Sequence, residues 1–181
     1  DRGEWYWGGT FCIPHEVVAT ADGQLDVKLP EEYVNCFKEK VDWKYLPVMG
    51  EYKLYGDTTV ELDGCGTTSY GFLEQPEEKF LFTGTVIPKE ANDSFGILLK
   101  SDWEASGCLF LEFDVAMQRV SLLSLPMGVD PFWEQSCQAV PKATEPGPDG
   151  VRVAEKTFAI ENGAAIDVKI SVDHDMVEVF V

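Results

Sequence analysis

The sequence predicts an all-β protein, a two-sheet antiparallel β-sandwich of the concanavalin A-like or jelly-roll type with one short helix. Apolar and polar residues alternate with a period of two along most of the chain, as they do in strands whose two faces meet different surroundings. Turn-forming dipeptides interrupt the alternation at short intervals, which is typical of sandwiches rather than of βαβ units. The 181 residues, 45% of them hydrophobic, suffice to bury one core.

The one helix is predicted from the segment PEEYVNCFKEK, residues 30–40. Pro30 suits the first helical position, the glutamates that follow suit the positive end of a helix, and the two lysines near its close suit the other end. Tyr33, Val34 and Phe37 would then share one face. A short amphipathic helix is therefore expected in an otherwise all-β chain.

Two segments carry the clearest strand patterns in the middle of the chain. Residues 80–87 have apolar side chains on both alternating faces and are predicted to form a central strand. Residues 108–115 have one polar edge, so one face of this strand is expected to meet solvent.

The last segment predicts a tight hairpin, because only His174 and Asp175 separate two alternating runs. A slip of one residue in the register would bury charged side chains in place of apolar ones. The side chains expected to face inward or to pair across the turn are Val168, Ile170, Val172, Val177, Val179 and Val181.

Other turns are predicted where small or polar dipeptides occur. These are Asp22-Gly23, Asp63-Gly64, Asn92-Asp93 and Asn162-Gly163. Residues 140–150 contain three prolines and two glycines, which predicts an extended surface loop within a single domain.

The charge balance bears on the partners of the protein. Thirty-two acidic and 14 basic residues give a net charge of -18. Such a surface repels phosphate groups, so nucleic acids and anionic membranes are not expected as partners.

The five cysteines are Cys12, Cys36, Cys65, Cys108 and Cys137. They are spread singly and form no C-x-x-C pair, so neither a zinc site nor another metal or cofactor is expected. Their odd number fits buried, reduced thiols better than a disulfide framework, although one or two disulfides stay open. This favours a cytoplasmic location.

One pair of carboxylates suggests chemistry. Glu112 and Asp114 lie two residues apart on a predicted strand and project from the same face. The segment resembles the E-x-D-x-x-E signature of jelly-roll β-glucanases, in which Glu112 would be the nucleophile and Asp114 its helper. Met117 and Gln118 stand where the acid/base glutamate would fall. The alternative is that both carboxylates form the solvated face of a strand that enters a turn over residues 114–119.

Aromatic residues offer a second kind of site, because rings can stack on the C–H faces of sugars. Trp5, Trp7 and Trp133 are the candidates for carbohydrate binding. The alternative is that such rings are buried, or that they pack one domain against another.

Both ends of the chain resemble glycoside hydrolase family 32, which contains invertases, levanases and inulinases. Residues 9–33 are similar to the junction where that family leaves its catalytic propeller through G-x-x-x-[IL]-P-R-E-[LV], with His15 in the place of Arg. Residues 172–181 are similar to the closing V-D-x-S-x-V-E-V-F-V, with Asp175 in the place of Ser. Residues 80–101 resemble a strand pair of the same domain.

The resemblance implies the accessory C-terminal β-sandwich of such a hydrolase. Residues 1–10 would be a linker from an N-terminal five-bladed catalytic propeller, and residues 11–181 a sandwich that is truncated at its C-terminus. The implied partners are this propeller and a fructan or a sucrose-type sugar. The propeller's own catalytic motifs do not occur in this sequence, so the resemblance implies no catalytic residue. The unpaired edge of the last strand would favour a homo-oligomer.

Three functional classes follow. The first is a non-catalytic accessory module that supports the propeller or an assembly of a β-fructosidase-like glycosidase. The second is a free-standing lectin-like carbohydrate-binding module. The third is a jelly-roll glycosidase that uses Glu112 and Asp114.

Overall fold

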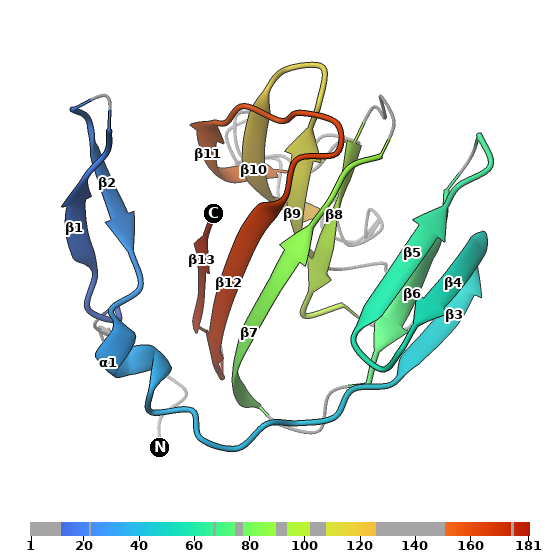
Figure 1. Ribbon diagram of the computed structural model, residues 1–181, viewed down its shortest axis with the longest axis horizontal. Helices are drawn as coiled ribbons and strands as arrows, with labels where there is room; N and C mark the ends of the chain where they lie inside the picture. The colour runs from blue at the N-terminus through green and yellow to red at the C-terminus, as the bar shows by residue number, and fades with distance from the viewer. Residues whose placement is uncertain are drawn as a thin grey trace, which may run out of the picture. The chain divides into compact units, whose positions relative to one another are not determined.

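The computed structural model describes residues 12–21, 23–66, 68–74, 78–89, 94–101, 108–125, 151–174 and 176–181. Their regular secondary structure is almost entirely β, as predicted, with thirteen strands and one helix of four residues (Figure 1). The chain divides into two compact units. One unit comprises Asp1–Gly84 with Asp167–Val181, and the other comprises Thr85–Ile166.

The first unit contains three antiparallel strand pairs, one three-stranded sheet and the helix. The pairs are β1 (Glu16–Ala19) with β2 (Leu25–Lys28), β3 (Tyr45–Met49) with β6 (Tyr70–Leu73), and β4 (Glu51–Tyr55) with β5 (Thr59–Asp63). The three-stranded sheet has the order β13 (Met176–Phe180), β12 (Ile166–Asp173), β7 (Lys79–Val86). The helix is α1 (Glu31–Val34).

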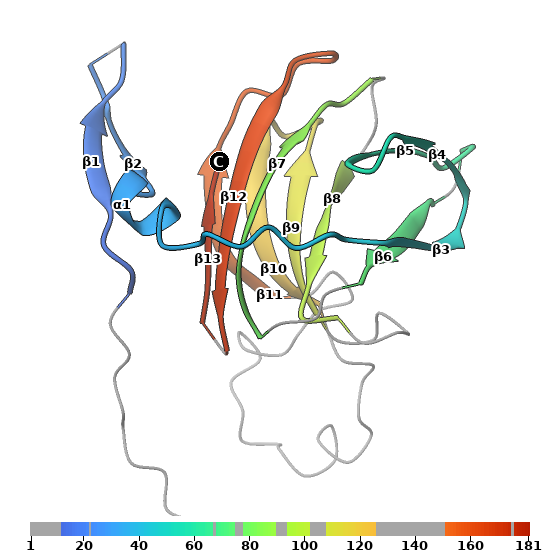
Figure 2. The same ribbon diagram turned by 60° about the horizontal axis from the view of Figure 1, so that its bottom comes forward.

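The second unit holds a four-stranded antiparallel sheet. Its order is β11 (Val151–Thr157), β10 (Arg119–Leu125), β9 (Cys108–Asp114), β8 (Ser94–Leu99), and Figure 2 shows these strands side by side. One face of this sheet is apolar. Phe113 is fully buried there, and its ring stacks on that of Phe95 with centroids 5.1 Å apart. The residues at alternate positions of β9 therefore belong to the opposite face.

The C-terminal hairpin has the predicted register. Ile170 lies opposite Val179, and Asp173 lies opposite Met176, so a two-residue turn joins β12 to β13. His174 begins this turn with a φ of 52°, as the favoured two-residue hairpin turns require. The inward-facing side chains of β12 are buried. The prediction that residues 80–87 form a central strand is wrong for the described sheet, where β12 is the middle strand and β7 lies beside it at the end.

The helix is shorter than predicted. It spans Glu31–Val34, and Pro30 precedes it as the N-cap instead of occupying the first helical position. The backbone N–H groups of Cys36 and Phe37 bond to carbonyls only three residues back, and this tighter turn ends the helix well before Lys40. The predicted shared face is confirmed in part, since the rings of Tyr33 and Phe37 meet edge to face.

The cysteines differ from the expectation of buried thiols. Cys108 is buried, but Cys12, Cys36 and Cys65 are exposed, and none of these four forms a disulfide. Cys137 and the predicted loop at residues 140–150 lie outside the described residues, as does the Asn92-Asp93 turn. The division into a linker and a sandwich domain stays a prediction.

Candidate functional site

The candidate site is the polar face of the four-stranded sheet, on the side opposite Phe113. Strand alternation sends Phe110, Glu112 and Asp114 of β9 to this face, together with Arg119, Ser121 and Leu123 of β10. Glu155 and Arg152 of β11 belong to it as well. Both carboxylates singled out in the sequence therefore lie on one face, as expected.

The register brings the polar side chains into two neighbouring rows across the strands. In one row Ser121 lies between Glu112 of β9 and Glu155 of β11. In the next row Asp114 lies directly opposite Arg119. Gly96 of β8 lies opposite Glu112 and contributes no side chain. The serine is therefore the short side chain between two long carboxylates.

A chain of ion pairs links most of the charges on this face. An amino group of Arg119 (Nη2) lies 2.9 Å from a carboxylate oxygen of Asp114, and its other amino group lies 3.8 Å from Glu155. Arg152 Nε in turn lies 3.3 Å from Glu155. Among the described residues Glu112 takes no part in this chain, so its carboxylate is the uncompensated charge of the face.

A β-bulge places Arg152 on this side of the sheet. The pairing of β10 with β11 shifts between Leu122 and Leu123, so that Arg152 lies opposite Leu123. Without the extra residue, side chains three positions apart on a strand would point to opposite faces. With it, Arg152 and Glu155 form their ion pair.

Two buried polar atoms on this face have no hydrogen-bond partner among the described residues. They are the hydroxyl oxygen of Ser121 and Nε of Arg119. Ser121 is only 1% exposed. Most buried polar groups in folded proteins have a hydrogen-bond partner, and an exception calls for an explanation, such as a catalytic role or an ordered water or ion. The polar face thus has hydrogen-bonding capacity at its centre that the described residues do not use.

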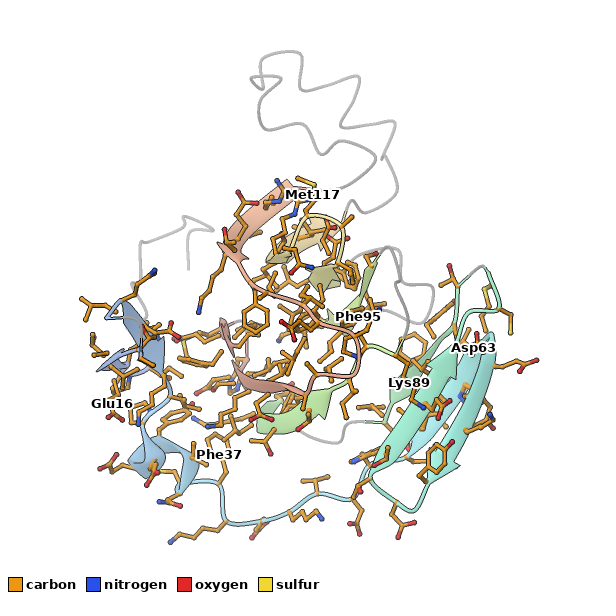
Figure 3. The ribbon with its side chains drawn as sticks, turned by 45° about the horizontal axis from the view of Figure 1, so that its top comes forward. Glu16, Phe37, Asp63, Lys89, Phe95 and Met117 are labelled. Carbon is orange, nitrogen blue, oxygen red and sulfur yellow. The ribbon has the colours of Figure 1, made fainter. Side chains whose placement is uncertain are left out.

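The turn that follows the two carboxylates, where Figure 3 labels Met117, is held by side-chain hydrogen bonds. Asp114 accepts a hydrogen bond from the backbone N–H of Met117, at 3.0 Å. The side-chain amide of Gln118 donates to the carbonyls of Val115 and Ile160 and accepts from the N–H of Ile160. Position 118, near where the β-glucanases carry their acid/base glutamate, is thus used to clamp a loop. A catalytic role for Glu112 and Asp114 stays a prediction.

Trp5, Trp7 and Trp133 lie outside the described residues, and so does Trp103. The described tryptophan is Trp43, which is half-buried in the segment before β3.

Sequence reasoning missed Arg119, Ser121, Arg152 and Glu155. A signal for the first two exists, because they alternate with apolar residues in RVSLLSL and thus share a face. The other two depend on the bulge, which leaves no clear mark in the sequence.

A second polar cluster lies at the turn between β12 and β13 in the first unit. Lys79 donates a hydrogen bond to Asp173, which also bonds to His174. The bond from Lys79, followed by that from His174, holds the pKa of Asp173 below its usual value. Asp173 in turn raises the pKa of Lys79. Both partners are solvent-accessible, and their bonds tie the turn to the start of β7.

The described residues contain no group of three or more side chains suited to hold a metal ion. No helix among them has the length and apolar character needed to cross a membrane.

Comparison with known proteins bears on the fold. No model of a known protein family matches this sequence, and no curated protein matches it either. Among solved structures, the chain is similar to the carbohydrate-binding module CBM66 from Bacillus subtilis, with a TM-score of 0.50 and 14% sequence identity over 77% of this chain and 73% of that one. This likeness confirms the predicted all-β sandwich fold.

Proposed function

We propose that this chain is a carbohydrate-binding β-sandwich that holds a sugar on the polar face of its four-stranded sheet. The observation that carries the proposal is the cluster of carboxylates and guanidinium groups around the unpartnered hydroxyl of Ser121. The similarity of the fold to a solved carbohydrate-binding module supports it.

The chemistry of the polar face suits a sugar. Carboxylates accept hydrogen bonds from sugar hydroxyls, guanidinium groups donate to them, and bonds with one charged partner are the stronger kind. Phe110 lies two residues before Glu112 on the same face of β9, where its half-buried ring is an apolar neighbour for the C–H surface of a pyranose or furanose ring. Because Asp114 is committed to Arg119 and to the turn, binding without hydrolysis is the role that fits these groups best.

A finer hypothesis is that the domain accompanies the catalytic propeller of a family 32-like glycoside hydrolase and binds a fructan or sucrose-type sugar. The two segments that carry the resemblance meet in the fold, which supports it. The N–H of Ile13 donates to Glu178 at 2.8 Å, and His15 Nε2 lies 2.6 Å from the other oxygen of the same carboxylate. The ring of His15 also meets that of Phe180 edge to face. The coding sequence upstream of Asp1 tests this hypothesis, since a propeller with three acidic motifs must be found there.

The binding proposal is tested by titrating the chain with soluble inulin, levan, xylan, mannan and mixed-linkage β-glucan in a calorimeter. Saturable binding of at least one of them is expected, without release of reducing sugar. Glu112→Gln should weaken that binding several-fold, up to about tenfold, because the glutamine oxygen still accepts the hydrogen bond but no longer carries a charge.

Glu161→Gln is the matched control, because it makes the same change in an exposed loop outside the sheet and should leave the affinity unchanged. Failure of every glycan to bind would overturn the proposed function. Equal losses in the two variants would show that net charge, and not the polar face, governs binding.

A further inference from the structure

We infer that the polar face selects uncharged glycans and excludes those that carry carboxylate or sulfate groups. The inference rests on the proposed function and names the class of sugar that the same site would take. Two observations support it. Some polar atoms of the face lack hydrogen-bond partners among the described residues, and the ion pairs of the face leave one negative charge unmatched.

The unused hydrogen-bonding groups call for a hydroxyl-rich partner. Arg119 Nε carries a hydrogen and can only donate, whereas the carboxylate of Glu112 can only accept. The hydroxyl of Ser121, between Glu112 and Glu155 in the register, can do both. A sugar hydroxyl likewise donates and accepts. Two adjacent hydroxyls can therefore accept a hydrogen bond from Arg119 and donate one to Glu112 at the same time. A carboxylate or sulfate offers acceptors alone, and an ammonium group offers donors alone.

The charges of the face point to the same ligand class. Asp114 and Glu155 are matched by Arg119 and Arg152, which leaves the negative charge of Glu112. The chain as a whole carries a net charge of -18. An anionic group held within about 5 Å of Glu112 would be repelled strongly enough to weaken binding about tenfold or more.

The centre of the polar face is buried, but its rim is accessible to solvent. Ser121 is 1% exposed, whereas the side chain of Glu155 is 52% exposed and makes its contact with Arg119 at the longer distance of 3.8 Å. Glu155 and its partner Arg152 of β11 thus form the accessible rim of the face.

The experiment compares chemically matched probes on the full chain. The four panel polysaccharides with primary hydroxyls are inulin, levan, mannan and mixed-linkage β-glucan. Each of these is titrated beside a derivative whose primary hydroxyls have been oxidised to carboxylates, and beside polygalacturonate and heparin. A neutral glycan should bind, its oxidised derivative should bind at least about tenfold more weakly, and the affinity for the neutral form should not change between low and high salt.

Equal or tighter binding of an anionic probe would overturn this inference and leave the proposed function standing. Absence of binding to every probe would overturn the proposed function itself. Glu112→Gln should reduce the ratio between the affinities for the neutral and the oxidised form of one glycan. An unchanged ratio of affinities would show that Glu112 is not the source of the selection.

Ser121→Ala tests the centre of the site. It should weaken binding of the neutral glycan about tenfold, while the urea midpoint of unfolding stays at or above that of the parent, since the hydroxyl has no partner to lose. The control is Ser124→Ala, on the opposite face of the same strand, which should bind like the parent. Parent-like binding by Ser121→Ala, or its failure to fold, would overturn the assignment of this hydroxyl to the ligand.

Discussion

Two serines of this protein are equally buried but differ in their hydrogen bonding. Ser121 of β10 and Ser171 of β12 are each 1% exposed. The hydroxyl of Ser171 lies 2.8 Å from that of Tyr33 in α1, whereas the hydroxyl of Ser121 has no partner in the part of the chain that the structure describes. The same chemical change, serine to alanine, should therefore have different effects on stability at the two positions.

The expected magnitudes follow from the cost of an unpaired hydroxyl. Leaving such a group buried costs about 1–3 kcal/mol, so Ser121→Ala removes a penalty. The cavity left by one oxygen offsets a few tenths of a kcal/mol of that gain, at about 24 cal/mol per Å³. The free energy of unfolding should therefore rise by about 0.5–2.5 kcal/mol. Ser171→Ala breaks a hydrogen bond and leaves Tyr33 unpaired, and it should cost about 1–2 kcal/mol.

Urea denaturation of both variants beside the parent measures this contrast. The slope of the transition should be the same in all three proteins, so that the midpoints report stability alone. In thermal scans each kcal/mol should shift Tm by about 2–4 °C for a chain of this size. If Ser121→Ala proved less stable than Ser171→Ala, the Ser121 hydroxyl would have to be bonded within the folded chain, and its place in a binding site would be lost.

Three further predictions concern the first unit. Ile170→Ala should lower the free energy of unfolding by about 2–5 kcal/mol, because the side chain is fully buried. A loss below about 1 kcal/mol in urea denaturation would contradict the place of Ile170 in the core. Asp173→Asn should lower the free energy of unfolding at neutral pH, because the ionised Asp173 accepts a stabilising bond from Lys79. The pKa of Asp173 lies below the usual value of 3.8, so the difference from the parent should vanish only as the pH falls through that lowered pKa. A difference that stays constant across the acid range in urea titrations would refute this. Glu178→Gln keeps an acceptor for the N–H of Ile13, whereas Glu178→Ala removes it, so amide exchange at Ile13 should accelerate markedly only in the alanine variant.

The alternation of inward and outward side chains along a strand was predictable, because it depends only on residues that are neighbours in the sequence. The hairpin of residues 166–180 has the expected register, since a slip would bury Lys169 and Glu178 in place of Ile170 and Val179. The end of α1 was not predictable from the same kind of pattern. The lysines after Phe37 fit a longer helix, but the tightened turn at Cys36 ends it first.

The candidate site was predictable only in part. Glu112 and Asp114 share a face because side chains alternate along any strand, and this requires no knowledge of their neighbours. Their partners come from other strands, and Arg119 reaches Asp114 through the register of β9 with β10. The role of Gln118 as a clamp on Ile160 likewise depends on a loop 42 residues away in the sequence.

The sequence by itself determined the all-β class, the acidic surface and the pair of carboxylates on one strand face, because composition and a period of two are local properties of the chain. The tertiary structure alone decided which charges are neutralised and which polar atoms are left without partners. The bulge that turns Arg152 toward Glu155 and the unpartnered hydroxyl of Ser121 arise from the register of β10 with its neighbours. Register is set by the summed pairing and burial of whole strands, and no short stretch of sequence specifies it.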